Sequence, residues 1–182
     1  MTILNVPGLF NSGPEHWQSY WEQLYPNCRR VLQKEWEAPH RDDWVEGIEQ
    51  AVACAEQPIV LTAHSTACAA VAHWAAGTRL GIAGALLVGP TDVESPNYPQ
   101  GPKGFQPMTL ARLPFPSITV ASEDDPWASL ERAQYFANCW GSQFVNIGAA
   151  GHINSDSKLG DWPQGRQLLE SLLRQTTQRT QP

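Results

Sequence analysis

The sequence predicts an α/β protein in which a mostly parallel sheet of about six strands is flanked by helices. Short apolar runs typical of strands alternate along the chain with segments whose apolar residues recur at helical spacing. The chain has 182 residues, 42% of them hydrophobic, which is enough for one domain with its own core. No repeat or linker divides it, so we expect a single domain over residues 1–175, followed by a polar C-terminal tail at 176–182 that frays.

In the first part of the chain, each predicted strand is followed by a predicted helix. The apolar run Thr2–Val6 starts the sheet, and after a Gly/Asn/Ser loop the tryptophan spacing within Glu15–Leu24 predicts a helix. Cys28–Gln33 is the second strand, although two arginines blur its pattern. Asp42 or Asp43 is expected to cap the next helix, because an aspartate side chain accepts hydrogen bonds from the first helical turn. That helix should end near Glu56.

The second part continues this alternation around one long loop. Ile59–Ala63 is a strand, and the helix Thr66–Gly77 ends at a glycine. The segment 89–116 holds seven of the 15 prolines, so we expect a loop with at most one helical turn. The other elements follow from the same periodicities: strands Ile82–Val88, Ser117–Ala121 and Gln143–Ile147, and helices over about Ala128–Cys139 and Trp162–Arg174.

Charge and cysteine content argue against several classes of partner. The formal net charge is −6 and no basic run occurs, which is unfavourable for nucleic acid or an anionic membrane as partner. The N-terminus lacks the cationic and apolar regions of a signal peptide, and no segment is apolar enough to span a membrane. The four cysteines lack C-x-x-C spacing, so we expect reduced thiols in a cytoplasmic protein. They are Cys28, Cys54, Cys68 and Cys139.

A single serine stands where the strand Ile59–Ala63 gives way to an alanine-rich helix. This is the pattern of a nucleophile elbow, a strained strand-to-helix turn that raises a hydroxyl above the sheet. The usual form is G-x-S-x-G, and here Ala63 and Ala67 flank Ser65 in place of the glycines. Small residues are needed because strand and helix approach each other closely there, and alanine keeps most of that space.

An acid and a base follow two later strands in the order that accompanies such an elbow. Asp125 comes after Ser117–Ala121, and His152 comes after Gln143–Ile147. The chain order Ser, Asp, His is that of α/β-hydrolases, and groups just past the carboxyl ends of parallel strands meet at one edge of the sheet. The sequence therefore predicts that Ser65, Asp125 and His152 lie together.

The sequence offers alternatives for the acid and for the base. Asp125 is preferred to Asp124 because the functional carboxylate of this loop type stands three residues after the small residue that ends the strand, here Ser122. Asp124 would then be a turn residue or a solvated charge, and Asp92 is a weaker candidate. His152 is preferred as base because His64, next to the serine, is expected to point away through the turn. The other histidines lie on a later helix or in helix-entry loops: His16, His40 and His73.

Several motifs together resemble the small serine hydrolases related to retinoblastoma-binding protein nine, a compact branch of the α/β-hydrolases. The resemblance extends from about residue 3 to about residue 173. The matching segments are Val6–Trp17, His64-Ser65, Leu113–Ser117, Ser122–Pro126, Gly151–Asn154 and Leu159–Pro163. The resemblance implies a single-domain α/β-hydrolase fold with no large cap domain, and it supports the same choice of Asp125.

The expected site needs hydrogen-bond donors for an oxyanion and a pocket for the substrate. The backbone N–H of Thr66, the residue after the nucleophile, and that of Leu9, in the loop after the first strand, are the expected donors, with Phe10 as the alternative to Leu9. Phe10, Phe105 and Trp127 are candidates for lining the substrate pocket.

These residues predict a serine hydrolase that cleaves small carboxylic esters through a Ser-His-Asp catalytic triad and an acyl-enzyme, with amides or aminoacyl bonds as the other candidate substrates. We expect no cofactor and no metal, because Asp156, Asp161 and His152 match no standard metal-ligand spacing. The alternative is a hydrolase-fold protein-interaction module with little or no turnover, which would have a protein partner. The order of the three site residues favours the enzyme. An aspartate-based or thiol-based hydrolase is disfavoured because position 65 is a serine.

Overall fold

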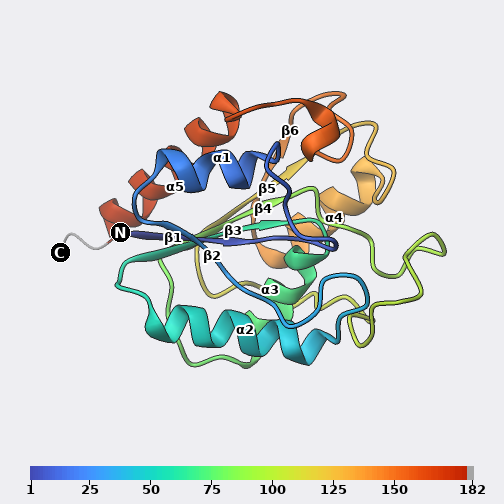
Figure 1. Ribbon diagram of the computed structural model, residues 1–182, viewed down its shortest axis with the longest axis horizontal. Coiled ribbons are helices and arrows are strands. Elements are labelled where there is room, and N and C mark those ends of the chain that lie inside the picture. Colours follow the sequence, from blue (N-terminus) through green and yellow to red (C-terminus); the bar gives the residue numbers. More distant parts are fainter. Residues whose placement is uncertain (180–182) are drawn as a thin grey trace.

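The computed structural model describes residues 1–179 and confirms the predicted α/β class. Six parallel strands form one sheet in the order β2-β1-β3-β4-β5-β6, and helices cover both of its faces (Figure 1). The strands are β1 (Thr2–Val6), β2 (Cys28–Arg30), β3 (Ile59–His64), β4 (Gly84–Val88), β5 (Ser117–Ala121) and β6 (Gln143–Asn146). The helices are α1 (Trp17–Leu24), α2 (Arg41–Cys54), α3 (Thr66–Gly77), α4 (Leu130–Trp140) and α5 (Pro163–Arg179), with a short 3₁₀-helix at Ser155–Ser157.

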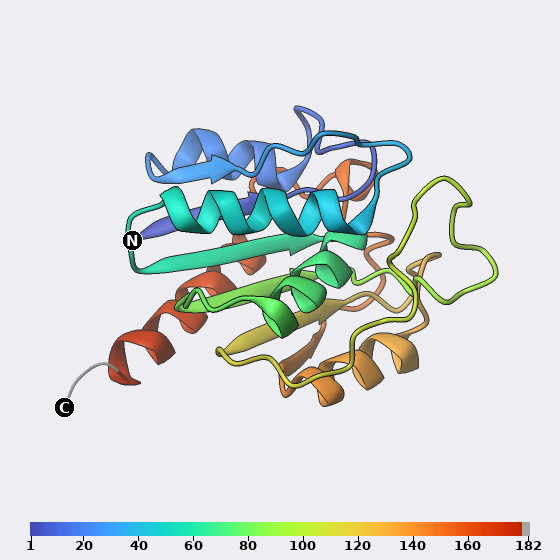
Figure 2. The same ribbon diagram turned by 90° about the horizontal axis from the view of Figure 1, so that it is seen from below.

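The two faces of the sheet pack against different helices because side chains alternate along each buried strand. On one face, Leu61 and Leu87 belong to the cluster that includes Trp44 of α2 and Phe136 of α4. On the other, Val60 and Leu86 pack with residues of α1 and α5. Figure 2, seen from below, shows α2, α3 and α4 in front of the sheet and α5 behind it. Burial on both faces makes the central strands continuous apolar runs, which is why their positions could be predicted.

Several boundaries differ from the prediction for identifiable reasons. β2 is shorter than predicted, because it lies at the edge of the sheet and pairs only with β1, over the three residues Cys28–Arg30. The prediction that Asp42 or Asp43 caps α2 is wrong: His40 is the cap, and its Nδ1 accepts a hydrogen bond from the Asp42 N–H. Both aspartates instead lie in the first turn, where the helix dipole favours a negative charge. Helix α5 continues five residues beyond the predicted end near residue 174, and residues 180–182 of the predicted tail lie outside the described residues.

The long segment between β4 and β5 contains no helix or strand, as predicted. Among the described residues, no helix is both long and apolar enough to cross a lipid bilayer. All four cysteines are free thiols.

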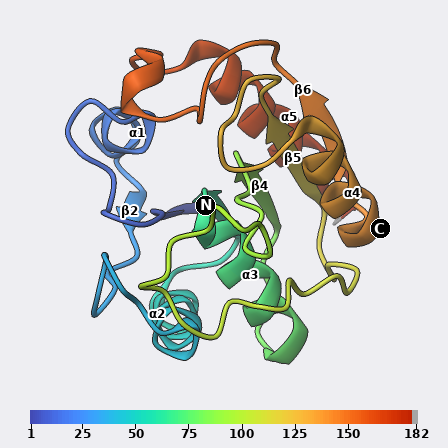
Figure 3. The same ribbon diagram turned by 90° about the vertical axis from the view of Figure 1, so that its right-hand side faces the viewer.

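The strand order places a crevice at one edge of the sheet. From β1 the chain passes to β2 on one side, whereas β3 and the later strands lie on the other side. The loops after β1 and β3 therefore diverge, and in open parallel sheets such a switch point is where ligands bind. Figure 3 looks onto this carboxyl edge, where the loops that follow the strands gather.

Candidate active site

Ser65 occupies a strained turn between β3 and α3. Its backbone has φ 62° and ψ −132°, a conformation that costs a non-glycine residue on the order of 1–3 kcal/mol and is found mainly at functional sites. The Ser65 N–H donates to the Val88 carbonyl of the neighbouring strand at 3.0 Å, which helps to hold this conformation. Ala63 and Ala67 are fully buried on either side. The alanines that replace the usual glycines are therefore compatible with the elbow.

Ser65, His152 and Asp125 are hydrogen-bonded in series. The Ser65 Oγ lies 2.8 Å from His152 Nε2, and His152 Nδ1 lies 2.9 Å from both carboxylate oxygens of Asp125. Because a carboxylate only accepts hydrogen bonds, Nδ1 carries a proton, and in the neutral imidazole Nε2 must accept the serine proton. The side chains of His152 and Asp125 are 10% and 3% exposed, so little water competes for these bonds.

The two alternative aspartates, Asp124 and Asp92, have partners other than His152. Asp124 Oδ1 accepts from the Ser122 hydroxyl at 2.7 Å and from the Gly151 N–H at 2.8 Å. These hydrogen bonds, chiefly the one from Ser122, lower the pKa of Asp124. Asp124 thus joins the loop after β5 to the loop that carries His152. Asp92 forms a two-point ion pair with Arg132, with N···O distances of 2.7 and 3.0 Å, and does not approach the imidazole.

Two backbone N–H groups beside the serine are free to bind an anion. Neither Leu9 nor Thr66 uses its N–H in a hydrogen bond with any described residue, and both residues line the cavity at Ser65. The loop after β1 approaches the serine so closely that a Cβ added at Gly8 would lie 2.7 Å from Ser65 Cβ. The Phe10 N–H, the expected alternative to Leu9, donates to the Trp36 carbonyl at 2.8 Å and is not available.

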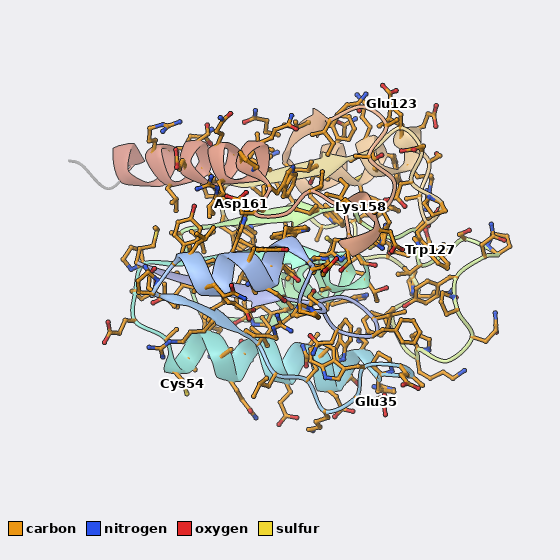
Figure 4. All side chains as sticks on the ribbon, turned by 45° about the horizontal axis from the view of Figure 1, so that its top comes forward. Glu35, Cys54, Glu123, Trp127, Lys158 and Asp161 are labelled. Carbon is orange, nitrogen blue, oxygen red and sulfur yellow. The ribbon has the colours of Figure 1, made fainter. Side chains whose placement is uncertain are left out.

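A cavity of about 380 Å³ opens at the serine. This is at the small end of the 300–1,000 Å³ typical of ligand sites. Phe10 and Trp127 stand at its rim, 69% and 37% exposed, as the sequence suggested for pocket residues. Figure 4 shows Trp127 at the same end of the molecule as Lys158, which lies on the segment after His152. Phe105 does not reach this cavity: it is buried in the core, with its ring 5.6 Å from that of Trp44.

The structure corrects the prediction that His64 points away from the site. Its imidazole is buried, stands 4.8 Å from the His152 ring, and donates through Nε2 to the His152 carbonyl at 2.9 Å. The His16 ring also contacts the His64 ring in a T-shaped arrangement, with the ring centroids 4.6 Å apart. Burial lowers the pKa of His64 far below the ordinary value, so His64 stays neutral.

His16 makes the stability of the fold sensitive to acid. Burial lowers its pKa from 6.5 to about 3, so below pH 6.5 the unfolded chain binds a proton at this position that the folded protein refuses. The free energy of unfolding should therefore fall as pH drops from about 6.5 to about 3. His16→Asn removes this contribution to the pH dependence of the free energy of unfolding. It keeps the helix cap, because asparagine can also accept from the Gln18 N–H.

Urea unfolding at pH 7, 6, 5 and 4 checks this expectation. The free energy of unfolding of His16→Asn should depend less steeply on pH than that of the wild type, by up to about 1.4 kcal/mol per pH unit. His16 also contributes to the low pKa of His64, so the comparison reports on His16 together with its effect on His64. Parallel pH dependences for the two proteins would contradict a neutral buried His16.

Sequence reasoning missed three residues near the serine. His16 and Tyr98 both line the cavity; His16 lies within the motif segment Val6–Trp17 but was regarded only as a helix-entry histidine, and Tyr98 lies in the long segment after β4. Thr91, in the loop after β4, places its Oγ1 3.0 Å from Ser65 Oγ. Its only signal in the sequence was its position just past the end of an expected strand, the place where site residues gather in parallel sheets.

The fold and the site together define an α/β-hydrolase. A serine at a strand-to-helix turn, an acid and a histidine after later strands, and free N–H groups at the switch point are the features of this class.

Comparisons with known proteins agree with this class and narrow it. A family model for "Serine hydrolase" matches residues 3–171. A YdeN-like hydrolase from Pectobacterium atrosepticum is 35% identical, with a TM-score of 0.85 over 96% of this chain and 91% of that one. Two structures share the fold at lower identity. The YdeN gene product of B. subtilis is 15% identical (TM-score 0.73; 95% and 98% coverage), and a thermophilic esterase from Thermogutta terrifontis is 16% identical (TM-score 0.68; 97% and 90%). A search of curated proteins found no significant match.

The chain belongs to the Serine hydrolase family, since the family model covers nearly all of it.

Proposed function

We propose that this protein is a serine hydrolase in which Ser65, His152 and Asp125 form the catalytic triad, and that it cleaves small carboxylic esters. The observation that carries the proposal is the unbroken series of hydrogen bonds from the Ser65 hydroxyl through the imidazole to a buried carboxylate. We further propose that the chain lies in the branch that includes retinoblastoma-binding protein nine, on the motifs quoted above.

Acylation would begin with attack of Ser65 Oγ on the ester carbonyl carbon. The serine proton passes to His152 Nε2, 2.8 Å away, and Asp125 stabilises the imidazolium that forms. The carbonyl oxygen becomes an oxyanion that the N–H groups of Leu9 and Thr66 would bind. Collapse of this intermediate breaks the bond to the alcohol oxygen, which takes the proton from Nε2. The acyl group remains on Ser65.

Deacylation would repeat these steps with water as the nucleophile. His152 Nε2 takes a proton from the attacking water, and the same N–H groups bind the second oxyanion. When the intermediate collapses, Ser65 Oγ leaves and recovers its proton from the imidazole. The carboxylic acid is released and the enzyme returns to its starting state.

The cavity favours a small substrate without a negative charge. No lysine or arginine is among the described residues that line it, whereas Asp156 is one of them. A negatively charged substrate would find no counter-ion there. The aromatic rings of Phe10 and Trp127 offer apolar contacts at the entrance. Amides and aminoacyl bonds are the other candidate substrates, because the same triad chemistry cleaves them.

Ser65→Ala tests this function. The wild type should react with a fluorophosphonate probe and hydrolyse members of a panel of p-nitrophenyl esters and aminoacyl amides, and Ser65→Ala should do neither. A folded wild type that neither reacts with the probe nor turns over any member of the panel would refute the enzyme and favour the interaction module. Retention of hydrolysis in Ser65→Ala would refute the assigned nucleophile.

A further inference from the structure

A second hydroxyl contacts the nucleophile. Thr91 Oγ1 lies 3.0 Å from Ser65 Oγ, on the loop that follows β4. Thr91 is only 3% exposed, yet it is one of the residues that line the cavity. A buried hydroxyl in contact with the reacting oxygen can influence the charge on that oxygen throughout the reaction.

The hydrogen-bond pattern determines which hydroxyl donates. The single proton of Ser65 is directed to His152 Nε2, because Nδ1 keeps its own proton for the Asp125 carboxylate. Ser65 Oγ then has lone pairs left and no proton to offer Thr91. Thr91 Oγ1 has no other hydrogen-bond partner among the described residues. The O–H of Thr91 therefore donates to Ser65 Oγ.

We propose that Thr91 is a further catalytic residue, whose hydroxyl stabilises the negative charge that develops on Ser65 Oγ in both acylation and deacylation. This inference rests on the proposed function. During attack, Oγ gains negative charge as its proton moves to His152, and a hydrogen bond to a charged oxygen is stronger than one to a neutral hydroxyl. In deacylation, the same oxygen gains charge as it leaves the acyl carbon. Thr91 keeps its proton throughout, so the balance of protons given above is unchanged.

The hydrogen bond from Thr91 to Ser65 Oγ is catalytic because it stabilises the transition state more than the ground state. In the resting enzyme the bond joins two neutral hydroxyls, and in the acyl-enzyme Oγ is an ester oxygen, which is a weak acceptor. Only while Oγ carries charge does the bond gain strength, and such differential stabilisation raises the rate of the chemical step.

The loop holds Thr91 in place on both sides. Two residues before it, the Gly89 N–H donates to the Val120 carbonyl at 2.8 Å. On the other side, the Asp92 N–H donates to the Trp127 carbonyl at 3.0 Å, and the Asp92 carboxylate is paired with Arg132 on α4. A donor that is already fixed at the reacting atom needs no reorganisation during the reaction, which is the condition for effective electrostatic stabilisation.

Thr91→Val and Thr91→Ser form a matched pair for the test. Valine keeps the shape and removes the hydroxyl, whereas serine keeps the hydroxyl and removes the methyl group. Two rates should be measured: the second-order rate of fluorophosphonate labelling, which reports on the nucleophile without the hydrolytic step, and kcat and KM for the best p-nitrophenyl ester. Thr91→Val should lower the labelling rate and kcat by about 10- to 100-fold with little change in KM. Thr91→Ser should stay within about threefold of the wild type, because the donor remains.

The outcomes separate this inference from the proposed function. If Thr91→Val reacts as fast as the wild type while Ser65→Ala is inactive, the role of Thr91 is overturned and the triad stands. If Thr91→Ser is as slow as Thr91→Val, the loss is due to packing, and the role of the hydroxyl is overturned. An unreactive wild type overturns both proposals. Should Thr91→Val fail to fold, as judged by its thermal midpoint, Thr91→Ala takes its place with the same expected loss.

Discussion

Replacing Asp125 with asparagine is expected to lower kcat by about 10⁴-fold and leave the fold intact, as the same change does in other enzymes with this arrangement. Both carboxylate oxygens of Asp125 are 2.9 Å from His152 Nδ1, and Oδ1 also accepts from the Trp127 N–H at 2.9 Å. An asparagine oriented to keep its carbonyl on the Trp127 N–H would present its NH₂ group to Nδ1.

That NH₂ group, in place of one carboxylate oxygen, would favour the wrong tautomer of His152. Nδ1 would become the acceptor, and the proton of the neutral imidazole would move to Nε2. Nε2 could then no longer accept the proton of Ser65, so the nucleophile would lose its base although every heavy atom stayed in place. The measurement is kcat for the best ester substrate, with the thermal midpoint as a check that the variant is folded.

Asp124→Asn is the matched control one residue away. Asp124 Oδ1 accepts from the Ser122 hydroxyl and the Gly151 N–H, and an asparagine carbonyl can accept both bonds. We expect less than about a tenfold change in kcat for this variant, because it does not touch the imidazole and keeps neutral hydrogen bonds. Equal losses for the two variants would mean that the acid is not Asp125 alone.

The parts of the fold that could be predicted are those whose local pattern reports burial. The strands β1 and β5 and the helix α3 have the predicted bounds, because each is buried along most of its length. The second strand was overestimated by three residues, since it lies at the edge of the sheet and pairs with β1 alone. Strand order was not predictable, because it depends on contacts between residues far apart in the chain.

Part of the candidate site could also be predicted, because the predicted strands fix where the residues that follow them lie. Consecutive parallel strands end at one edge, so the residues that follow them converge whatever the details of packing. This is why Ser65, Asp125 and His152 could be grouped before any contact was known. The direction in which a side chain points cannot be predicted in this way, because it depends on contacts with residues far apart in the chain. His64 was expected to face away, but its ring contacts those of His16 and His152, which lie 48 and 88 residues away in the sequence. The hydroxyl of Thr91 was missed for the same reason.

Gly8→Ala is expected to lower kcat by about 100- to 1,000-fold without unfolding the protein, the loss typical of removing one oxyanion donor. Gly8 has no unusual backbone angle to prevent the substitution. The obstacle is space: the new Cβ would lie 2.7 Å from Ser65 Cβ and 2.9 Å from the His64 carbonyl oxygen. Both of these atoms belong to the elbow, which the sheet and α3 hold firmly, so the loop after β1 must move instead. The N–H of Leu9 moves with it, away from the position that the oxyanion would occupy.

Gly13→Ala is the matched control for Gly8→Ala. It tests whether the fall in kcat is due to displacement of the Leu9 N–H and not to the loss of any glycine from this loop. Gly13 lies in the same loop, and a Cβ there would meet no atom within 4 Å, so we expect the kcat of Gly13→Ala to stay within about twofold of the wild type.

Rates of fluorophosphonate labelling and ester hydrolysis should fall together for Gly8→Ala, because both reactions build negative charge on an oxygen beside Leu9 and Thr66. If Gly8→Ala kept its full rate with a normal thermal midpoint, the loop would have relaxed without moving a needed donor, and the assignment of the Leu9 N–H to the oxyanion site would fail. The triad could still be correct in that case, since its hydrogen bonds do not pass through this loop.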